Sequence, residues 1–161
     1  MRGLAPVKAA IAFAIGGSVL AVFVPAFIRN LHASRLTEPL DGLGRIARRA
    51  AELADGSPQL HAYPESAPLS PPQVARAELV NDPPGVWLHP TWRLLDFGFT
   101  TPHAYSFELT SKNAADVSTF SAVAHGDLDG DGVLSTFRIS GEVRPGQPLR
   151  VLPLEVMREV E

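Results

Sequence analysis

The segment AAIAFAIGGSVLAVFVPAFI, Ala9 to Ile28, decides the fold, because its twenty consecutive residues carry no charged side chain. At 1.5 Å per residue, a helix of this length is about 30 Å long, which matches the hydrocarbon core of a bilayer. The segment 1–8 before it is short and basic, with Arg2 and Lys8. We therefore predict a transmembrane helix over 9–28 and expect the lipid bilayer as one partner of the chain.

The residues that follow, 29–56, predict an amphipathic extension of that helix. Their apolar side chains recur every three or four positions, which is typical of one buried helix face: Leu36, Leu40, Leu43, Ile46, Ala47, Ala50 and Leu53. Asp55 and Gly56 supply a stop signal. Pro39 interrupts the pattern, so we expect a kink or a restart there, with Thr37 as the N-cap.

A Pro-rich loop is predicted over 57–90. Eight prolines lie in this stretch, and proline excludes both a long helix and a central strand. Apolar residues alternate with the prolines and are expected to pin the loop to the domain: Leu60, Tyr63, Leu69, Val74, Leu79, Val80 and Trp87.

The last third predicts an antiparallel sheet. Short runs rich in β-forming residues, separated by turn signals, occur at 103–109, 117–125 and 133–139, and a final edge strand is expected at 149–154. The sheet needs a cover for its apolar face, and the amphipathic helix supplies one. The predicted fold class is α+β: a long N-terminal helix, transmembrane and then amphipathic, packed on a small antiparallel β-sheet within a globular region 57–161.

Composition narrows the functional classes. The 161 residues carry a net charge of −3 with a pI near 5.9 and include no cysteine. The acidic balance argues against a nucleic-acid partner, and the missing cysteines exclude disulfides, cysteine-ligated zinc and thiol catalysis. The five histidines lack metal-ligand spacing, and no Gly-x-Ser-x-Gly, P-loop or Gly-x-Gly-x-x-Gly motif occurs. We expect no enzymatic activity, and we expect the aromatic side chains in the core.

The apolar segment has three interpretations. A secretory signal peptide also combines a basic start with an apolar core, but this run is longer than usual and continues into an amphipathic helix. A plain single-pass anchor for a periplasmic or extracellular domain is the second interpretation. Basic residues flank the segment on both sides, so their distribution does not settle its orientation.

The third interpretation rests on the order of motifs in residues 3–54: a glycine, an apolar helix, and then PAFIRNLHASRLTEPLDGLGRI from Pro25 to Ile46. This order resembles the N-terminal helix of type IV pilins and of the pseudopilins of type II secretion systems. Further segments resemble the globular domains of pilin-like proteins from myxobacteria-type organisms: PESAPLSPPQ (Pro64–Gln73), PHAYSFEL (Pro102–Leu109), FSAVAHGDLDGDGVLSTFRISG (Phe120–Gly141), and the pair Trp87 and Trp92.

The resemblance implies roles for residues at the start of the chain. Gly3 corresponds to the processing glycine of the family, and Leu4 to the first residue of the mature chain, which is methylated. The family's glutamate, which is thought to pair with the N-terminal amine of a neighbouring subunit, is replaced here by Lys8. This reversed charge and the short leader fit a minor or divergent subunit better than a standard major pilin.

The assembly helix has features that fit packing in both lipid and a filament core. Gly16 and Gly17 permit close approach of helices. Pro25 removes a backbone hydrogen bond and lets the helix bend, and it forms the family's Pro-Ala-Phe triplet with Ala26 and Phe27.

These features predict a pilin-like structural subunit of a type IV pilus or a type II secretion system, acting by self-association. Its partners would be other pilin or pseudopilin subunits or the assembly machinery. The chain would span the inner membrane once, with its globular domain in the periplasm or outside the cell, where a surface filament would hold it if filaments form. The alternative is a single-pass, membrane-anchored periplasmic binding or sensor domain that does not assemble.

One local motif suggests a cation. Asp127, Asp129 and Asp131, followed by Gly132, match the first half of an EF-hand loop, and carboxylate oxygens in a tight turn suit Ca²⁺. Position twelve of that loop is Arg138 instead of glutamate, so a complete EF-hand is excluded. Asp-Gly pairs are equally typical of a plain hairpin turn. Glu142 or Asp116 would complete a site only if the fold brings them close.

Overall fold

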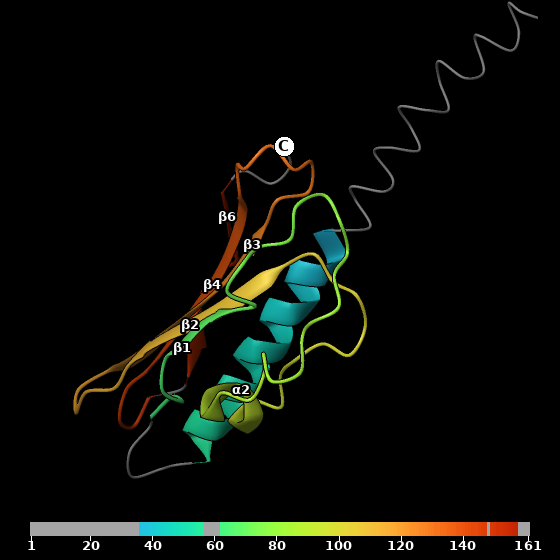
Figure 1. The fold of residues 1–161 in the computed structure, drawn as a ribbon. Coiled ribbons are helices and arrows are strands. Elements are labelled where there is room, and N and C mark those ends of the chain that lie inside the picture. The colour runs from blue at the N-terminus through green and yellow to red at the C-terminus, as the bar shows by residue number, and fades with distance from the viewer. Residues whose placement is uncertain (1–35, 57–61, 148, 158–161) are drawn as a thin grey trace, which may run out of the picture. The chain divides into compact units, whose positions relative to one another are not determined.

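The computed structural model describes residues 36–56, 62–147 and 149–157, which form an α+β domain (Figure 1). A helix over 36–55 lies across one face of an antiparallel sheet, as the sequence predicted for this part of the chain. The transmembrane helix expected at 9–28 lies outside these ranges. Within them, no helix has both the length and the apolar character needed to cross a bilayer.

The sheet is antiparallel throughout. Its strands follow the order β1-β2-β3-β4-β5, and β6 pairs with β4 beside β5. Their bounds are β1 (Ala67–Ser70), β2 (Ser106–Lys112), β3 (Ser118–Gly126), β4 (Ser135–Val143), β5 (Arg150–Val151) and β6 (Glu155–Met157).

The three central strands β2, β3 and β4 confirm the predicted meander, with bounds shifted by a few residues. The single edge strand expected at 149–154 is wrong in detail. Only Arg150–Val151 of that range form a strand, β5, and β6 begins beyond the range, after a break that contains Pro153. Proline has no N–H to donate to a ladder, which accounts for the interruption.

The helix over 36–55 buries the predicted apolar stripe. Leu43, Ile46 and Ala50 are fully buried, whereas Leu40 is 47% exposed and does not belong to the contact face. Helical structure continues on both sides of Pro39, so the expected restart and the N-cap at Thr37 are wrong. The Pro39 side chain is itself fully buried and packs into the core.

The core lies between this helix and the inner face of the sheet. Phe107 from β2, Phe120 from β3 and Phe137 from β4 are at most 2% exposed. On the central strand β3, alternate inward positions carry the small residues Ala122 and Ala124, which leave space for the large rings beside them.

The expectation that the aromatic residues form the core is confirmed for most of them, including Trp92, Phe97 and Tyr105, whereas Trp87 and Phe99 are partly buried against it.

The Pro-rich region contains two short elements. Its only strand among the described residues is β1, which pairs with β2 alone and therefore lies at the edge of the sheet. An edge position suits the proline in this strand, because proline has no N–H to donate to a second neighbour. A short helix, α2 (Pro90–Leu94), was not predicted; it begins at a proline, and the His89 side chain caps it. Tyr63 is buried as an anchor, but Leu79 is 54% exposed and is not one.

Candidate functional site

The predicted aspartate loop connects β3 to β4 and brings its three carboxylates together. Asp127, Asp129 and Asp131 each place an oxygen within 4.8 Å of the others. Asp127 is buried, whereas the other two are exposed. Neither Glu142 nor Asp116 joins this group in the part of the chain that the structure describes.

Backbone hydrogen bonds determine the shape of the loop. The two oxygens of Asp127 accept from the N–H groups of Gly130 at 2.8 Å and Gly132 at 3.2 Å. Both glycines have positive φ, +82° and +92°, which residues with side chains rarely adopt. Asp131 accepts from Val133 N–H at 2.6 Å. The sequence pattern therefore forms the tight carboxylate-lined turn that it predicts.

The donor set fits a partial calcium site. The three carboxylates supply the hard oxygen ligands that Ca²⁺ prefers, and clustered negative charges repel one another without a cation. The nearest positive group is Arg76, whose Nε lies 3.9 Å from Asp127 Oδ2. At the position of the EF-hand glutamate, Arg138 lies on β4 and pairs with Glu155 at 3.7 Å. Water would have to complete the coordination, so the loop suits weak binding.

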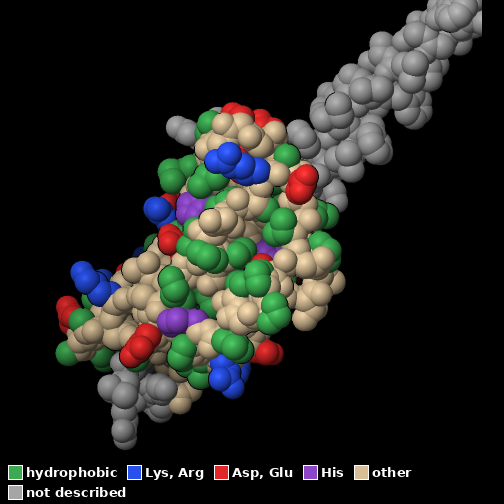
Figure 2. Space-filling model, viewed as in Figure 1, with side chains coloured by type: hydrophobic (Ala, Val, Ile, Leu, Met, Phe, Trp, Pro, Cys, Tyr) green, Lys and Arg blue, Asp and Glu red, His purple; other side chains and the backbone are tan. Residues whose placement is uncertain are grey.

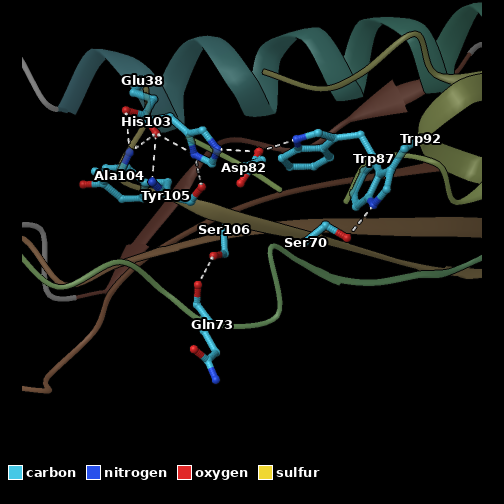
Figure 3. A network of polar contacts seen from close by, with 10 residues as sticks. All are labelled: Glu38, Ser70, Gln73, Asp82, Trp87, Trp92, His103, Ala104, Tyr105 and Ser106. Carbon is cyan, nitrogen blue, oxygen red and sulfur yellow. Dashed lines mark hydrogen bonds and ion pairs between the residues drawn. The ribbon is translucent and has the colours of Figure 1, made fainter. Parts of the chain in front are cut away.

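A second polar cluster, not predicted from the sequence, lies buried beneath the start of the helix (Figure 3). His103 is 1% exposed. Its Nε2 lies 2.7 Å from Asp82 Oδ2 and its Nδ1 lies 2.9 Å from the carbonyl oxygen of Tyr105. The Trp87 indole N–H also donates to Asp82 Oδ2. We refer to Glu38, Asp82, Trp87 and His103 as the His103 network.

Glu38 connects this network to the helix. Its carboxylate accepts hydrogen bonds from the backbone N–H groups of Ala104, at 3.0 Å, and Tyr105, at 2.8 Å, and it lies 3.9 Å from His103 Nδ1. The network therefore ties together the helix, the loop before α2 and the lead into β2. No signal in the sequence predicts it, because Glu38, Asp82 and His103 lie at least 21 residues from one another in the chain.

The outer face of the sheet carries one titratable histidine. His125 accepts or donates a hydrogen bond with Thr136 Oγ1 at 3.0 Å. Burial lowers the pKa of His125 below its usual value, and Arg138 acts in the same direction, whereas Glu108 raises it.

On the face visible in Figure 2, acidic and basic side chains are scattered among polar and apolar groups and do not gather by sign.

The remaining predicted site residues lie outside the described ranges. They comprise the processing pair and the assembly-helix positions: Gly3, Leu4, Lys8, Gly16, Gly17, Pro25, Ala26 and Phe27.

Comparison of the chain with models of protein families, with curated proteins and with solved structures yields no match.

Proposed function

We propose that this chain is a pilin-like structural subunit, of the minor or divergent kind, in a type IV pilus or a type II secretion system. It acts by self-association of its N-terminal helix and not by catalysis. It is held in the inner membrane by residues 9–28, and its domain faces the periplasm or the cell exterior.

The observation that carries this proposal is the order of the elements along the chain. A charge-free segment of twenty residues precedes a helix that covers an antiparallel sheet with a single apolar stripe. Such an apolar segment suits both lipid and a bundle of like helices, because both surroundings are apolar. The resemblance of residues 3–54 to pilins supports the same function.

The mature N-terminus tests the proposal most directly. Mass spectrometry of the full chain isolated from membranes should show loss of three residues and a methyl group on Leu4. The variant Gly3→Leu should remain unprocessed, whereas the control Gly17→Ala should be processed as in the parent. Cleavage near residue 26 or 33 would show instead that the apolar segment is a signal peptide.

Self-association is tested separately by cross-linking. The chain contains no cysteine, so a single Ala14→Cys substitution reports on one position only. In an assembling subunit, oxidation of membranes should yield disulfide-linked dimers through the apolar helix. The matched variant Asp116→Cys, on the exposed turn between β2 and β3, should yield fewer dimers.

One observation favours the second candidate, a membrane-anchored binding or sensor domain that does not assemble. Lys8 stands where the family carries a glutamate, and an ammonium group cannot pair with the amine of a neighbouring subunit. An unprocessed N-terminus together with the absence of cross-linked dimers would support this candidate over the pilin-like subunit.

A further inference from the structure

A cleft of about 730 Å³ lies where the helix over 36–55 meets α2 and the segment after it. This volume is within the range of small-molecule sites. Its lining combines aromatic residues, of which Trp87 and Phe99 are partly exposed, with four charged residues that we call the rim: Asp41, Arg45, Arg93 and Asp96.

The Trp87 ring is held in a fixed orientation. Trp87 is half-buried, and its indole N–H donates to Asp82, which in turn contacts the buried His103 at 2.7 Å (Figure 3). The Trp87 side chain also packs closely against Gly98. The contact is so close that a Cβ added to Gly98 would lie 3.0 Å from Trp87 Cγ. An aromatic ring held in this way loses little conformational entropy when a ligand stacks on it.

The rim offers charged groups that are available to a ligand. Among the described residues, none of the side chains of Asp41, Arg45, Arg93 and Asp96 forms an ion pair. The Arg45 guanidinium lies over the Phe97 ring, 5.1 Å from its centroid, which is a cation–π contact. Asp96 closes α2: its N–H donates to the carbonyl oxygen of Arg93 and the Phe97 N–H donates to that of Trp92, so its positive φ of 50° belongs to the end of this helix and holds Asp96 at the edge of the cleft.

We propose that this cleft binds a neutral oligosaccharide. A pyranose ring has an apolar C–H face that stacks on an indole, and its hydroxyl groups match planar carboxylate and guanidinium groups. The positive charges of two arginines on the rim are balanced by the negative charges of two aspartates. A strongly charged ligand of either sign would therefore be repelled by one of the two pairs. Oligosaccharide binding would be a function separate from assembly. In it the His103 network would have the role of positioning Trp87.

Titration of the purified full chain with chitohexaose, cellohexaose and oligogalacturonate tests the proposal. Tryptophan fluorescence and calorimetry should both report saturable binding of at least one neutral oligosaccharide. The two neutral probes distinguish amino-sugar polymers from glucans, and oligogalacturonate tests for simple charge attraction.

Two exposed rim variants connect binding to the cleft. Arg93→Ala and Asp96→Asn should each weaken binding about tenfold, because each removes a charged hydrogen-bonding group. Asparagine tolerates a positive φ, so Asp96→Asn should keep its thermal midpoint. The control Arg49→Ala, whose guanidinium pairs with Glu52 at 2.8 Å and does not line the cleft, should bind as the parent does.

Three results would overturn the proposal: no saturable binding of either neutral probe, binding of oligogalacturonate alone, or parent-like affinity in both rim variants.

Discussion

Asp127 illustrates how one residue of a motif can differ from its neighbours in role. It is 2% exposed, and both of its oxygens accept backbone hydrogen bonds, whereas Asp129 and Asp131 are exposed. Asp129 and Asp131 each accept one backbone hydrogen bond, so all three carboxylates shape the loop, and Asp127 is the one that does so with both oxygens. The sequence predicted the cluster from its spacing but not this difference.

Calcium should stabilise the folded chain through this loop. At a Ca²⁺ concentration tenfold above Kd, linkage predicts a gain of about 1.4 kcal/mol, or roughly 5 °C in thermal midpoint. Asp129→Ala should remove the shift in a thermal melt, because it deletes one of three ligands. Asp116→Ala, an exposed aspartate outside the loop, should retain it. No shift in the parent, or an equal shift in Asp129→Ala, contradicts the metal site.

We expect the buried hydroxyl of Tyr63 to make the folded domain less stable at high pH. Its hydroxyl is buried and has no hydrogen-bond partner among the residues that the structure describes, and burial, followed by the charge of Glu142, raises the pKa of Tyr63 to about 12. Between pH 10 and 12 the unfolded chain releases the tyrosine proton while the folded chain keeps it, so the free energy of unfolding falls as pH rises. This contribution reaches about 1.4 kcal/mol at pH 11.

Urea unfolding at pH 9 and pH 11 checks this expectation. Tyr63→Phe should show a smaller loss between the two pH values than the parent, because phenylalanine has no proton to release. The substitution should also be close to neutral at pH 9, since the deleted hydroxyl makes no hydrogen bond within the described part of the chain. Equal losses in the two proteins would refute this role for Tyr63.

At the scale of elements, the helix over 36–55 depends on a glycine at one contact with the sheet. A Cβ added at Gly42 would lie 2.6 Å from two ring carbons of Phe107, a buried core residue. A Cβ at Gly44 would meet nothing within 4 Å. Glycine is therefore needed at the first position for close packing, but not at the second.

Alanine substitutions at these two glycines should have opposite effects. Gly42→Ala should destabilise the domain by about 1–3 kcal/mol, because the Phe107 ring must move. Gly44→Ala should stabilise it by about 0.5–1 kcal/mol, because alanine favours a helix. Chemical unfolding of the two variants against the parent provides the measurement. A stabilised Gly42→Ala would show that the helix does not contact the sheet there.

Element types were predictable wherever periodicity is strong. The 3–4 spacing of Leu43, Ile46 and Ala50 predicted a buried helix face, and the run 117–125 predicted β3. Elements that depend on their surroundings were not predictable. α2 is only five residues long, too short for a period to show, and its Trp92 is fully buried, with its indole N–H donating to Ser70 Oγ, 22 residues away, at 2.9 Å.

At the scale of the whole molecule, Lys8 provides a test of assembly. If the chain assembles as proposed, Lys8→Glu, which introduces the acidic residue that type IV pilins carry at this position, should increase cross-linked dimers of the Ala14→Cys chain severalfold, because a carboxylate can pair with the neighbouring N-terminal amine. Lys8→Gln, which removes the charge without supplying a carboxylate, is the matched control and should give a smaller increase. A decrease with Lys8→Glu would indicate that the lysine itself supports the contact between subunits.

The sequence by itself determined the α+β class, the amphipathic stripe, the three central strands and the spacing of the aspartate loop, because each of these depends on residues close together in the chain. Only the tertiary structure decided which polar groups meet. Glu38, Asp82 and His103 come from three separate segments, and the cleft beside Trp87 draws on the helix, α2 and the loop after it. Such sites arise when long-range packing brings together residues whose local sequence shows no motif.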